Sequence, residues 1–270
     1  MSLIELRHVS KRFGWLVVLD DVSLSIEAGK AIVIIGASGT GKSVLIKHIV
    51  GLLKPDKGEV WFDNQRIDQL PERKLMDVRQ RFGFLFQMGA LFDSATVAEN
   101  VGFPLVEHTH KPLEEIREIV QRKLALVGLP DVGKKMPAEL SGGQKKRVAL
   151  ARAIALNPEV ILYDEPTTGL DPIRSDVINE LIIKLQRELQ VTSIVVTHDM
   201  NSAFKIADRI VMLHEGHIIF DGTPKEIQQS QDPVVKRFVV GEASETELAE
   251  IGKVGGPGAP SAPIRDIEGK

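Results

Sequence analysis

One glycine-rich segment constrains this chain more than any other feature: Gly36-Ala37-Ser38-Gly39-Thr40-Gly41-Lys42-Ser43. It fits the pattern G-x-x-x-x-G-K-[ST] and follows a short apolar, β-branched run, Ala31 to Ile35. A phosphate chain needs many N–H donors at close range. Glycines let the backbone curl around it, and the following helix presents its positive N-terminus. In such a loop Lys42 reaches the β- and γ-phosphates and the Ser43 hydroxyl binds Mg²⁺, which an ordinary glycine-rich turn does not do.

A second apolar run ends in two adjacent carboxylates. Val160-Ile161-Leu162-Tyr163 is followed by Asp164 and Glu165, and side chains at the carboxyl end of a parallel strand face the ligand crevice. Such acidic pairs are common on surfaces, but a phosphate loop in the same chain favours a functional interpretation. We expect Asp164 to hold Mg²⁺ through water and Glu165 to polarise the attacking water as general base.

The order of the apolar segments predicts an α/β fold with a largely parallel sheet. Buried strands are expected at 31–35, 160–162 and 193–197, and amphipathic helices at 113–127, with Pro112 in the first turn, at 142–155, and after Asp171-Pro172. The first 30 residues indicate short strands with turns, with Leu3, Glu5, Arg7 and Val9 on one face. The helix-rich interval 88–157 interrupts the strands and predicts an inserted helical subdomain. Residues 242–270 contain GGPGAPSAP and predict a flexible tail.

Composition narrows the class of protein. A net charge of −3 gives no positive field to attract nucleic acid, so no nucleic-acid partner is expected. With no cysteine, the chain has neither disulfides nor thiol chemistry. No stretch approaches the roughly 18 apolar residues of a spanning helix, and the charged start does not fit a signal peptide. A membrane role would therefore come through a partner.

The most diagnostic segment is Leu140-Ser141-Gly142-Gly143-Gln144. Ser141 is placed to cap the next helix, and the glycines leave the helix N-terminus open to an anion. One chain does not need two anion sites for one nucleotide. The need arises when two chains pack head to tail and each helix tip covers the γ-phosphate that the other chain holds. The segment matches the signature sequence of ABC ATPases, which the chain resembles over roughly residues 3 to 240, with the same order of motifs.

This resemblance implies a fold and further site residues. The fold is an ABC-type nucleotide-binding domain at 1–241, with a RecA-like parallel-sheet core, an N-terminal antiparallel β subdomain and an inserted helical subdomain. Phe13 matches the aromatic residue that stacks on adenine, with Trp15 as the rival. The other matched positions are Gln87, which senses Mg²⁺ and the attacking water, Asp171 in the loop that crosses the dimer interface, and His198, which contacts the γ-phosphate. The implied function is ATP hydrolysis with Mg²⁺ by a homodimer that drives a transporter.

The segment from Phe86 to Thr109 indicates which transporters the chain is most similar to. Its letters, FQMGALFDS followed by NVGFPLVEHT, resemble the ATPases of Mce-type phospholipid transporters, including the system that maintains outer-membrane lipid asymmetry. The segment 232–238 also resembles the end of those proteins. The resemblance implies phospholipid or a related hydrophobic cargo, and a place on the cytoplasmic face of the inner membrane, peripheral through a permease. It also implies an Mce-domain partner and allows a small STAS-domain partner.

Other functions remain open at this point. An importer ATPase for amino acids or another small solute is the closest alternative, because the Phe86–Thr109 segment can be a connection that several importers share. A soluble ABC ATPase acting on DNA is less favoured, since the roughly 100 residues between Gly41 and Ser141 lack the heptads of a long coiled coil. Ribosomal members usually carry two ATPase domains, and a non-hydrolysing scaffold does not need Glu165.

Overall fold

The run Ala31–Ile35 forms strand β3 of a six-stranded sheet in the computed structural model, which describes residues 2–87 and 89–242. The strand order is β10-β9-β3-β8-β7-β6. The other strands are β6 (Phe82–Leu85), β7 (Val160–Asp164), β8 (Thr192–Val196), β9 (Arg209–His214) and β10 (His217–Gly222). Strands β6 to β9 pair in parallel with β3 among them, and only β10 is antiparallel to its neighbour. The α/β prediction is confirmed.

The parallel sheet is buried on both faces because its strands are apolar throughout. In β3, Val33 and Ile35 pack into one hydrophobic core, to which helices on the same face of the sheet contribute apolar side chains. Ile32 and Ile34 point the other way, into a second core shared with the N-terminal strands. This double burial explains why the strand sequences do not alternate between apolar and polar residues.

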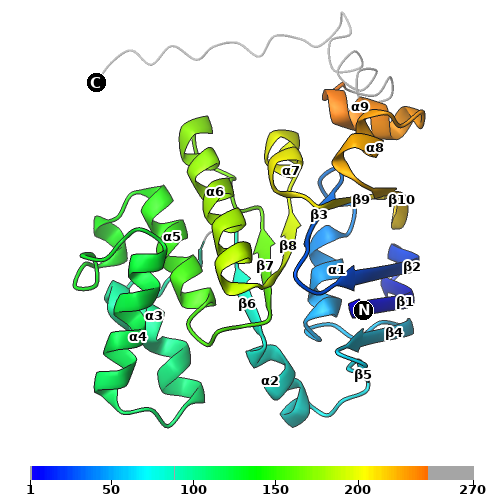
Figure 1. Ribbon diagram of the computed structural model, residues 1–270. Helices are drawn as coiled ribbons and strands as arrows, with labels where there is room; N and C mark the ends of the chain where they lie inside the picture. Colours follow the sequence, from blue (N-terminus) through cyan, green and yellow to red (C-terminus); the bar gives the residue numbers. More distant parts are fainter. Residues whose placement is uncertain (1, 88, 243–270) are drawn as a thin grey trace, which may run out of the picture.

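A four-stranded antiparallel sheet, ordered β2-β1-β4-β5, covers the second core. Its strands are β1 (Ser2–Phe13), β2 (Leu16–Glu27), β4 (Lys57–Phe62) and β5 (Gln65–Arg66). Helix α1 (Lys42–Ile49) lies between the two sheets, with Leu45, Ile46 and Ile49 in the core, and α2 (Glu72–Gln80) follows β5 (Figure 1).

The prediction of short strands at the N-terminus, with Val9 on the same face as Leu3, was wrong in two respects. The first two strands are 12 residues each. Val9 is fully buried with Ile4 and Leu6, although it was expected on the opposite face. His8 has a left-handed backbone, φ 53°, and the β1–β2 register shifts between Leu6 and Val9. This bulge inserts one residue and moves Val9 to the buried face.

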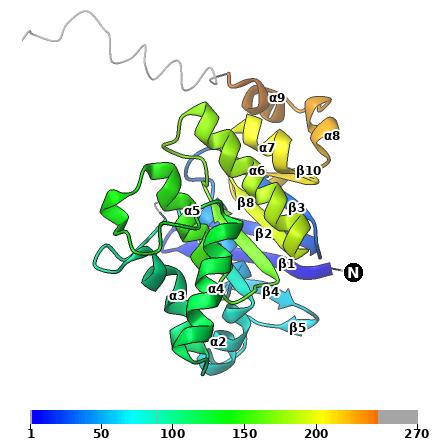
Figure 2. The same ribbon diagram turned by 60° about the vertical axis from the view of Figure 1, so that its left-hand side comes forward.

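The interval 88–157 contains the two predicted helices, α4 (Leu113–Leu126) and α5 (Gly142–Ala153). It also contains α3 (Val97–His108) and the short 3₁₀ turn Pro137–Glu139, which were not predicted individually. Pro112 is the N-cap of α4, not part of its first turn. Figure 2 shows α3, α4 and α5 as a group beside the main sheet. The remaining helices of the described residues are α6 (Pro172–Leu189), α7 (Met200–Ile206), α8 (Pro224–Gln228) and α9 (Pro233–Val240).

The predicted tail, residues 242–270, lies almost entirely outside the residues that the structure describes, which end at position 242. Met88 also lies outside them. In the part of the chain that the structure describes, no helix combines the length and the apolar character needed to cross a membrane.

Candidate active site

The strand order brings four predicted segments to the carboxyl edge of the parallel sheet. Gly36 follows β3, His198 follows β8, Asp164 ends β7, and Gln87 lies just beyond β6. Strands β3, β8, β7 and β6 are consecutive neighbours, so these residues line one edge although they are far apart in the sequence (Figure 1). This edge is where ligands bind in open α/β sheets.

The phosphate loop is fixed at both ends by glycines that no other residue can replace without displacing the backbone. A Cβ at Gly36 would lie 2.2 Å from the Leu213 carbonyl oxygen of β9. At Gly41, where φ is +99°, a Cβ would lie 2.8 Å from the Val18 carbonyl oxygen of β2. The loop is therefore clamped between the two sheets, while Ala37, Ser38 and Gly39 are exposed at its tip. Gly41 leads directly into α1, whose N-terminus faces the loop.

Lys42 is folded back onto this loop. Its Nζ donates to the carbonyl oxygens of Gly36 at 2.8 Å and Ala37 at 2.7 Å, and the side chain is 8% exposed. Thr40 Oγ1 donates to the same Ala37 oxygen at 2.9 Å. Burial lowers the pKa of Lys42, while the charges of Glu165 and Asp164 act in the opposite direction. The cation and the two carboxylates therefore share one electrostatic site.

Asp164 and Ser43 fit the requirements of Mg²⁺. Burial, and then the charge of Glu165, raise the pKa of Asp164, so a nearby cation would favour its ionised form. Over residues 2–87 and 89–242 no cluster of three or more acidic, histidine or cysteine side chains could hold a metal by itself. Mg²⁺ is commonly bound by one or two carboxylates together with substrate phosphates. Asp164 supplies such a carboxylate, and the exposed Ser43 supplies a hydroxyl next to the phosphate loop.

Glu165 is held by its backbone and by two side chains. Its φ is 50°, a left-handed conformation that is uncommon for a residue with a Cβ. His198 Nδ1 lies 3.0 Å from Glu165 Oε1, and Thr168 Oγ1 donates to Oε2 at 3.1 Å. An ionised carboxylate can only accept, so the histidine contact requires a proton on Nδ1. The side chain of Glu165 is 15% exposed, which leaves it access to a water molecule.

Sequence reasoning missed the residue that supports this turn from behind. Lys146, on α5, is 7% exposed. Its Nζ donates to the carbonyl oxygens of Glu165, Pro166 and Thr168, at 3.3, 2.6 and 2.8 Å. A lysine within Gln144-Lys145-Lys146-Arg147 gives no sign of burial, because most helix lysines are solvated.

The signature segment lies elsewhere in the chain. Ser141 is the N-cap of α5, as predicted: its Oγ accepts from the Gln144 N–H at 3.3 Å, and Gln144 Oε1 accepts from the Ser141 N–H at 2.9 Å. Added Cβ atoms would meet only Leu170 from Gly142 and Arg174 from Gly143, both at 3.8 Å. The segment therefore borders the loop that leads to α6. Among the described residues, it makes no hydrogen bond to the phosphate loop.

Asp171 and Phe13, two further predicted residues, lie at the ends of α6 and β1. Asp171 caps α6, its Oδ1 accepting from the Arg174 N–H at 2.9 Å. Phe13 ends β1, 47% exposed, with Lys11 Nζ 5.6 Å from its ring centroid. Trp15, in the turn that follows, is 87% exposed. Both aromatic residues belong to the hairpin whose Val18 packs on Gly41, so the hairpin carries them to the phosphate-loop side of the molecule.

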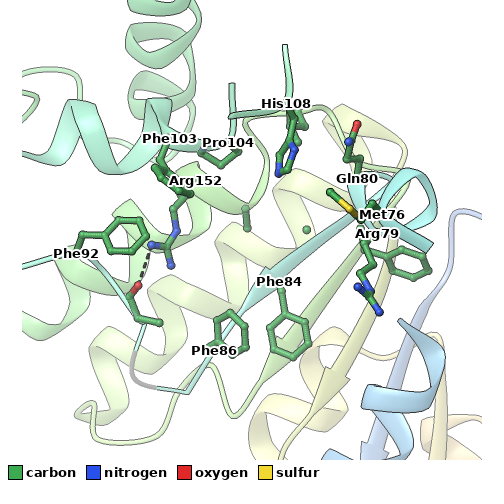
Figure 3. Close-up of a pocket in the computed structure, with 15 residues that line it drawn as sticks. Met76, Arg79, Gln80, Phe84, Phe86, Phe92, Phe103, Pro104, His108 and Arg152 are labelled. Carbon is green, nitrogen blue, oxygen red and sulfur yellow. Dashed lines mark hydrogen bonds between the residues drawn. The ribbon is translucent and has the colours of Figure 1, made fainter. Parts of the chain in front are cut away.

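A groove of about 460 Å³ lies beside this site, between α2, β6, α3 and α5. Figure 3 shows Phe84, Phe86 and Phe92 along it, with Arg79, His108 and Arg152 at its edges. Its exposed apolar side chains include Phe86, Phe92, Phe103 and Met76. Arg152 donates to the carbonyl oxygens of Ala90 at 2.8 Å and Gly89 at 2.9 Å, which ties the segment after Gln87 to α5.

The fold, the clamped phosphate loop and the strand-end carboxylates define an ATPase of the ATP-binding-cassette class. A family model described as "ABC transporter" matches residues 19–168, and the chain belongs to this family. ATP is thus the nucleotide of the site.

Individual relatives extend this similarity over most of the chain. The chain is 46% identical over 242 residues to the intermembrane phospholipid transport system ATP-binding protein MlaF of Haemophilus influenzae, covering 90% of this chain and 92% of that protein. It is 44% identical over 238 residues to a probable ribonucleotide transport ATP-binding protein of Mycobacterium tuberculosis, covering 88% of this chain and 66% of that one. Among solved structures, a dimeric ATP-binding cassette in a post-hydrolysis state with ADP and phosphate is similar with a TM-score of 0.75 and 36% identity, covering 82% of this chain and 98% of that chain.

Proposed function

We propose that this chain is the ATP-hydrolysing subunit of a membrane transporter for phospholipid or a related hydrophobic cargo. The observation that carries the proposal is the groove beside the active site. Among the groove residues that follow β6 in the sequence, most belong to the segment Phe86–Thr109, which resembles lipid-transporter ATPases. They include Phe86, Phe92, Phe103 and His108. The relative named as a phospholipid transport ATP-binding protein supports the same cargo, since its identity extends over nearly the whole of both chains.

The proposed chemistry is hydrolysis of the γ-phosphate of ATP. Lys42 and the loop amides bind the phosphates, and Phe13 stacks on the adenine. Ser43, Asp164 and Gln87 would hold Mg²⁺, which would supply positive charge against the charge that develops on the phosphates. Glu165 accepts the proton of a water whose oxygen bonds to the γ-phosphorus while the bond to the bridging oxygen of ADP breaks. His198, held by Glu165, contacts the transferred phosphate.

The site is proposed to be complete only in a homodimer. The signature segment Ser141-Gly142-Gly143-Gln144 borders Leu170 and Arg174 of its own chain, with room for a Cβ at both glycines. Internal packing therefore does not require glycine there, whereas close approach of a partner's phosphate would. Head-to-tail packing would give each phosphate loop a signature segment, with Asp171 at the interface. The dimeric cassette among the similar structures supports this arrangement.

The groove is proposed to hold a short cytoplasmic helix of an integral permease. Its floor is apolar, and Arg79, Arg152 and His108 stand at its edges (Figure 3). An amphipathic helix with an apolar face and acidic residues at its margins would complement this surface. Since Gln87 lies next to the groove, closure of the dimer can move the permease by the free energy with which ATP favours the closed state. An Mce-domain protein and a STAS-domain protein are the further proposed partners, and the chain is placed peripherally on the cytoplasmic face of the inner membrane.

An importer for a small solute is the second candidate, because the mycobacterial relative is named as a probable ribonucleotide transporter. The two functions separate in proteoliposomes that contain the chain, its permease and the Mce-domain partner. We expect ATP-dependent movement of fluorescent phospholipid, and no saturable phospholipid binding by the chain alone. Ribonucleotide or amino-acid uptake without lipid movement would refute the lipid function and leave the ATPase intact.

A further inference from the structure

Lys146 is a buried cation that the proposed hydrolytic steps do not use. Its ammonium group has three hydrogens, and each finds a carbonyl oxygen: Glu165, Pro166 and Thr168. All three acceptors belong to one turn of four residues, directly after the end of β7. Burying a lysine is costly unless its charge is compensated. Here the converging carbonyl dipoles, and the charge of Glu165, compensate it.

The turn that Lys146 binds sets the position of Glu165. The left-handed backbone of Glu165, φ 50°, is unfavourable for a residue that carries a Cβ. Surrounding contacts must therefore hold it there. Glu165 N donates to the Val196 carbonyl at 2.9 Å, and Thr168 Oγ1 donates to the carboxylate. On the opposite side, the Lys146 ammonium group donates hydrogen bonds to three carbonyl oxygens of the turn. Without it, three carbonyls lose their charged donor and the turn can relax toward an unstrained conformation.

Helix α5 joins this turn to a second, distant group. Its N-cap is Ser141, and Lys146 follows at the fifth position along the same helix. The helix has a closed capping box and no proline or glycine after Gly143, so it moves as one body. We propose that Lys146 is a positioning residue that makes the catalytic Glu165 of each chain respond to the nucleotide bound by the partner chain, through Ser141. This inference rests on the shared site proposed above.

The mechanism has three steps. Docking of Ser141 on the partner's γ-phosphate fixes the tilt of α5. The tilt of α5 fixes the Lys146 ammonium, and the ammonium fixes the turn that carries Glu165. Each site would then hydrolyse ATP well only when the other is filled, which predicts positive cooperativity between the two ATP molecules.

The test uses Lys146→Met, which keeps the length of the side chain and removes the ammonium. We expect kcat to fall by roughly 10- to 100-fold, as for a misplaced catalytic group, and the Hill coefficient to fall toward unity, while the nucleotide Kd of the monomer stays within twofold. Lys146→Arg, which keeps charge and donors, should restore most of the rate. Lys123→Met is the matched control: Lys123 is 8% exposed and donates to Asn157 Oδ1 at 2.6 Å, away from Glu165.

The outcomes separate positioning from a structural role. If Lys146→Met and Lys123→Met lose rate equally, or if Lys146→Met keeps wild-type kcat and cooperativity, the proposal is overturned. If Lys146→Met does not fold, Lys146→Gln replaces it under the same criteria. Ser141→Arg, measured in parallel, tests the shared site itself. Hydrolysis that survives Ser141→Arg refutes the shared site, whereas a block by Ser141→Arg with normal Lys146→Met refutes only the role of Lys146.

Discussion

Replacing Glu165 by glutamine removes its ability to accept a proton and its negative charge, and it keeps the size and shape of the side chain. The amide oxygen can still accept from Thr168 Oγ1, now 3.1 Å from Oε2. The amide N–H₂ can donate to His198 Nδ1, now 3.0 Å from Oε1, once the histidine proton moves to Nε2. The backbone contacts to Val196 and Lys146 do not involve the side chain. The substitution therefore tests proton transfer rather than the shape of the site.

We expect kcat to fall by about 10²- to 10⁴-fold, the usual contribution of a general base. This corresponds to about 2.7–5.4 kcal/mol of transition-state stabilisation. ATP binds as before, because Lys42 and the loop hold the phosphates, and ATP that is not consumed should trap the dimer. Steady-state phosphate release, nucleotide titration and size-exclusion chromatography with ATP measure the three effects on one preparation.

A surface glutamate provides the control. Glu188, on α6, is 49% exposed and 4.0 Å from Lys184, so Glu188→Gln should leave kcat and thermal stability nearly unchanged. Turnover of Glu165→Gln within tenfold of wild type, in a chain that binds ATP normally, would show that another group activates the water. The assignment of Glu165 as general base would then be wrong.

Three further substitutions test other parts of the proposal. Ser141→Arg should abolish hydrolysis and leave the nucleotide affinity of the monomer unchanged, because the cation fills the space of the partner's phosphate; a parallel loss of both would place Ser141 in its own chain's site. Lys42→Ala should weaken ATP binding by about 10- to 100-fold, since hydrogen bonds to charged groups contribute about 1.5–3 kcal/mol, and a fluorescent-nucleotide titration would contradict this if affinity were retained. His108→Glu places an exposed negative charge at the edge of the groove; in proteoliposomes it should leave ATP hydrolysis intact and reduce lipid movement, because it repels the acidic margin of the permease helix, and equal coupling to wild type would argue against a permease contact there.

Much of this site follows from strand chemistry. The phosphate loop and the Asp164–Glu165 pair are recognisable because each follows a run of apolar residues, and parallel strands place such ends on one edge. The sheet order puts β7 and β3 on either side of β8, so the two segments end on the same edge of the sheet. The cap at Ser141 was also predicted, because Ser141 is a short polar side chain before a helix. Asp171 caps α6 by the same chemistry, although it was expected only at the dimer interface.

What the sequence could not predict depends on contacts between distant segments. The bulge at His8 depends on the pairing of β1 with β2, and no sequence pattern in residues 3–9 predicts it. Lys146 is buried only because the turn after β7 offers three carbonyl oxygens at that point of α5. The groove combines side chains from four elements, and its apolar residues read as ordinary core positions until the structure leaves them exposed.

The contacts of Arg152 give α5 a third attachment, on the groove side. Along the helix, Lys146 stands about 7.5 Å from Ser141 and about 9 Å from Arg152, at a rise of 1.5 Å per residue. Because α5 is one continuous helix, Lys146 shares in the displacement of both ends. A shift of α5 by the segment that Arg152 holds would therefore reach the turn of Glu165 as well as Ser141. A helix that docks in the groove should accordingly change the position of the general base together with the position of the signature end.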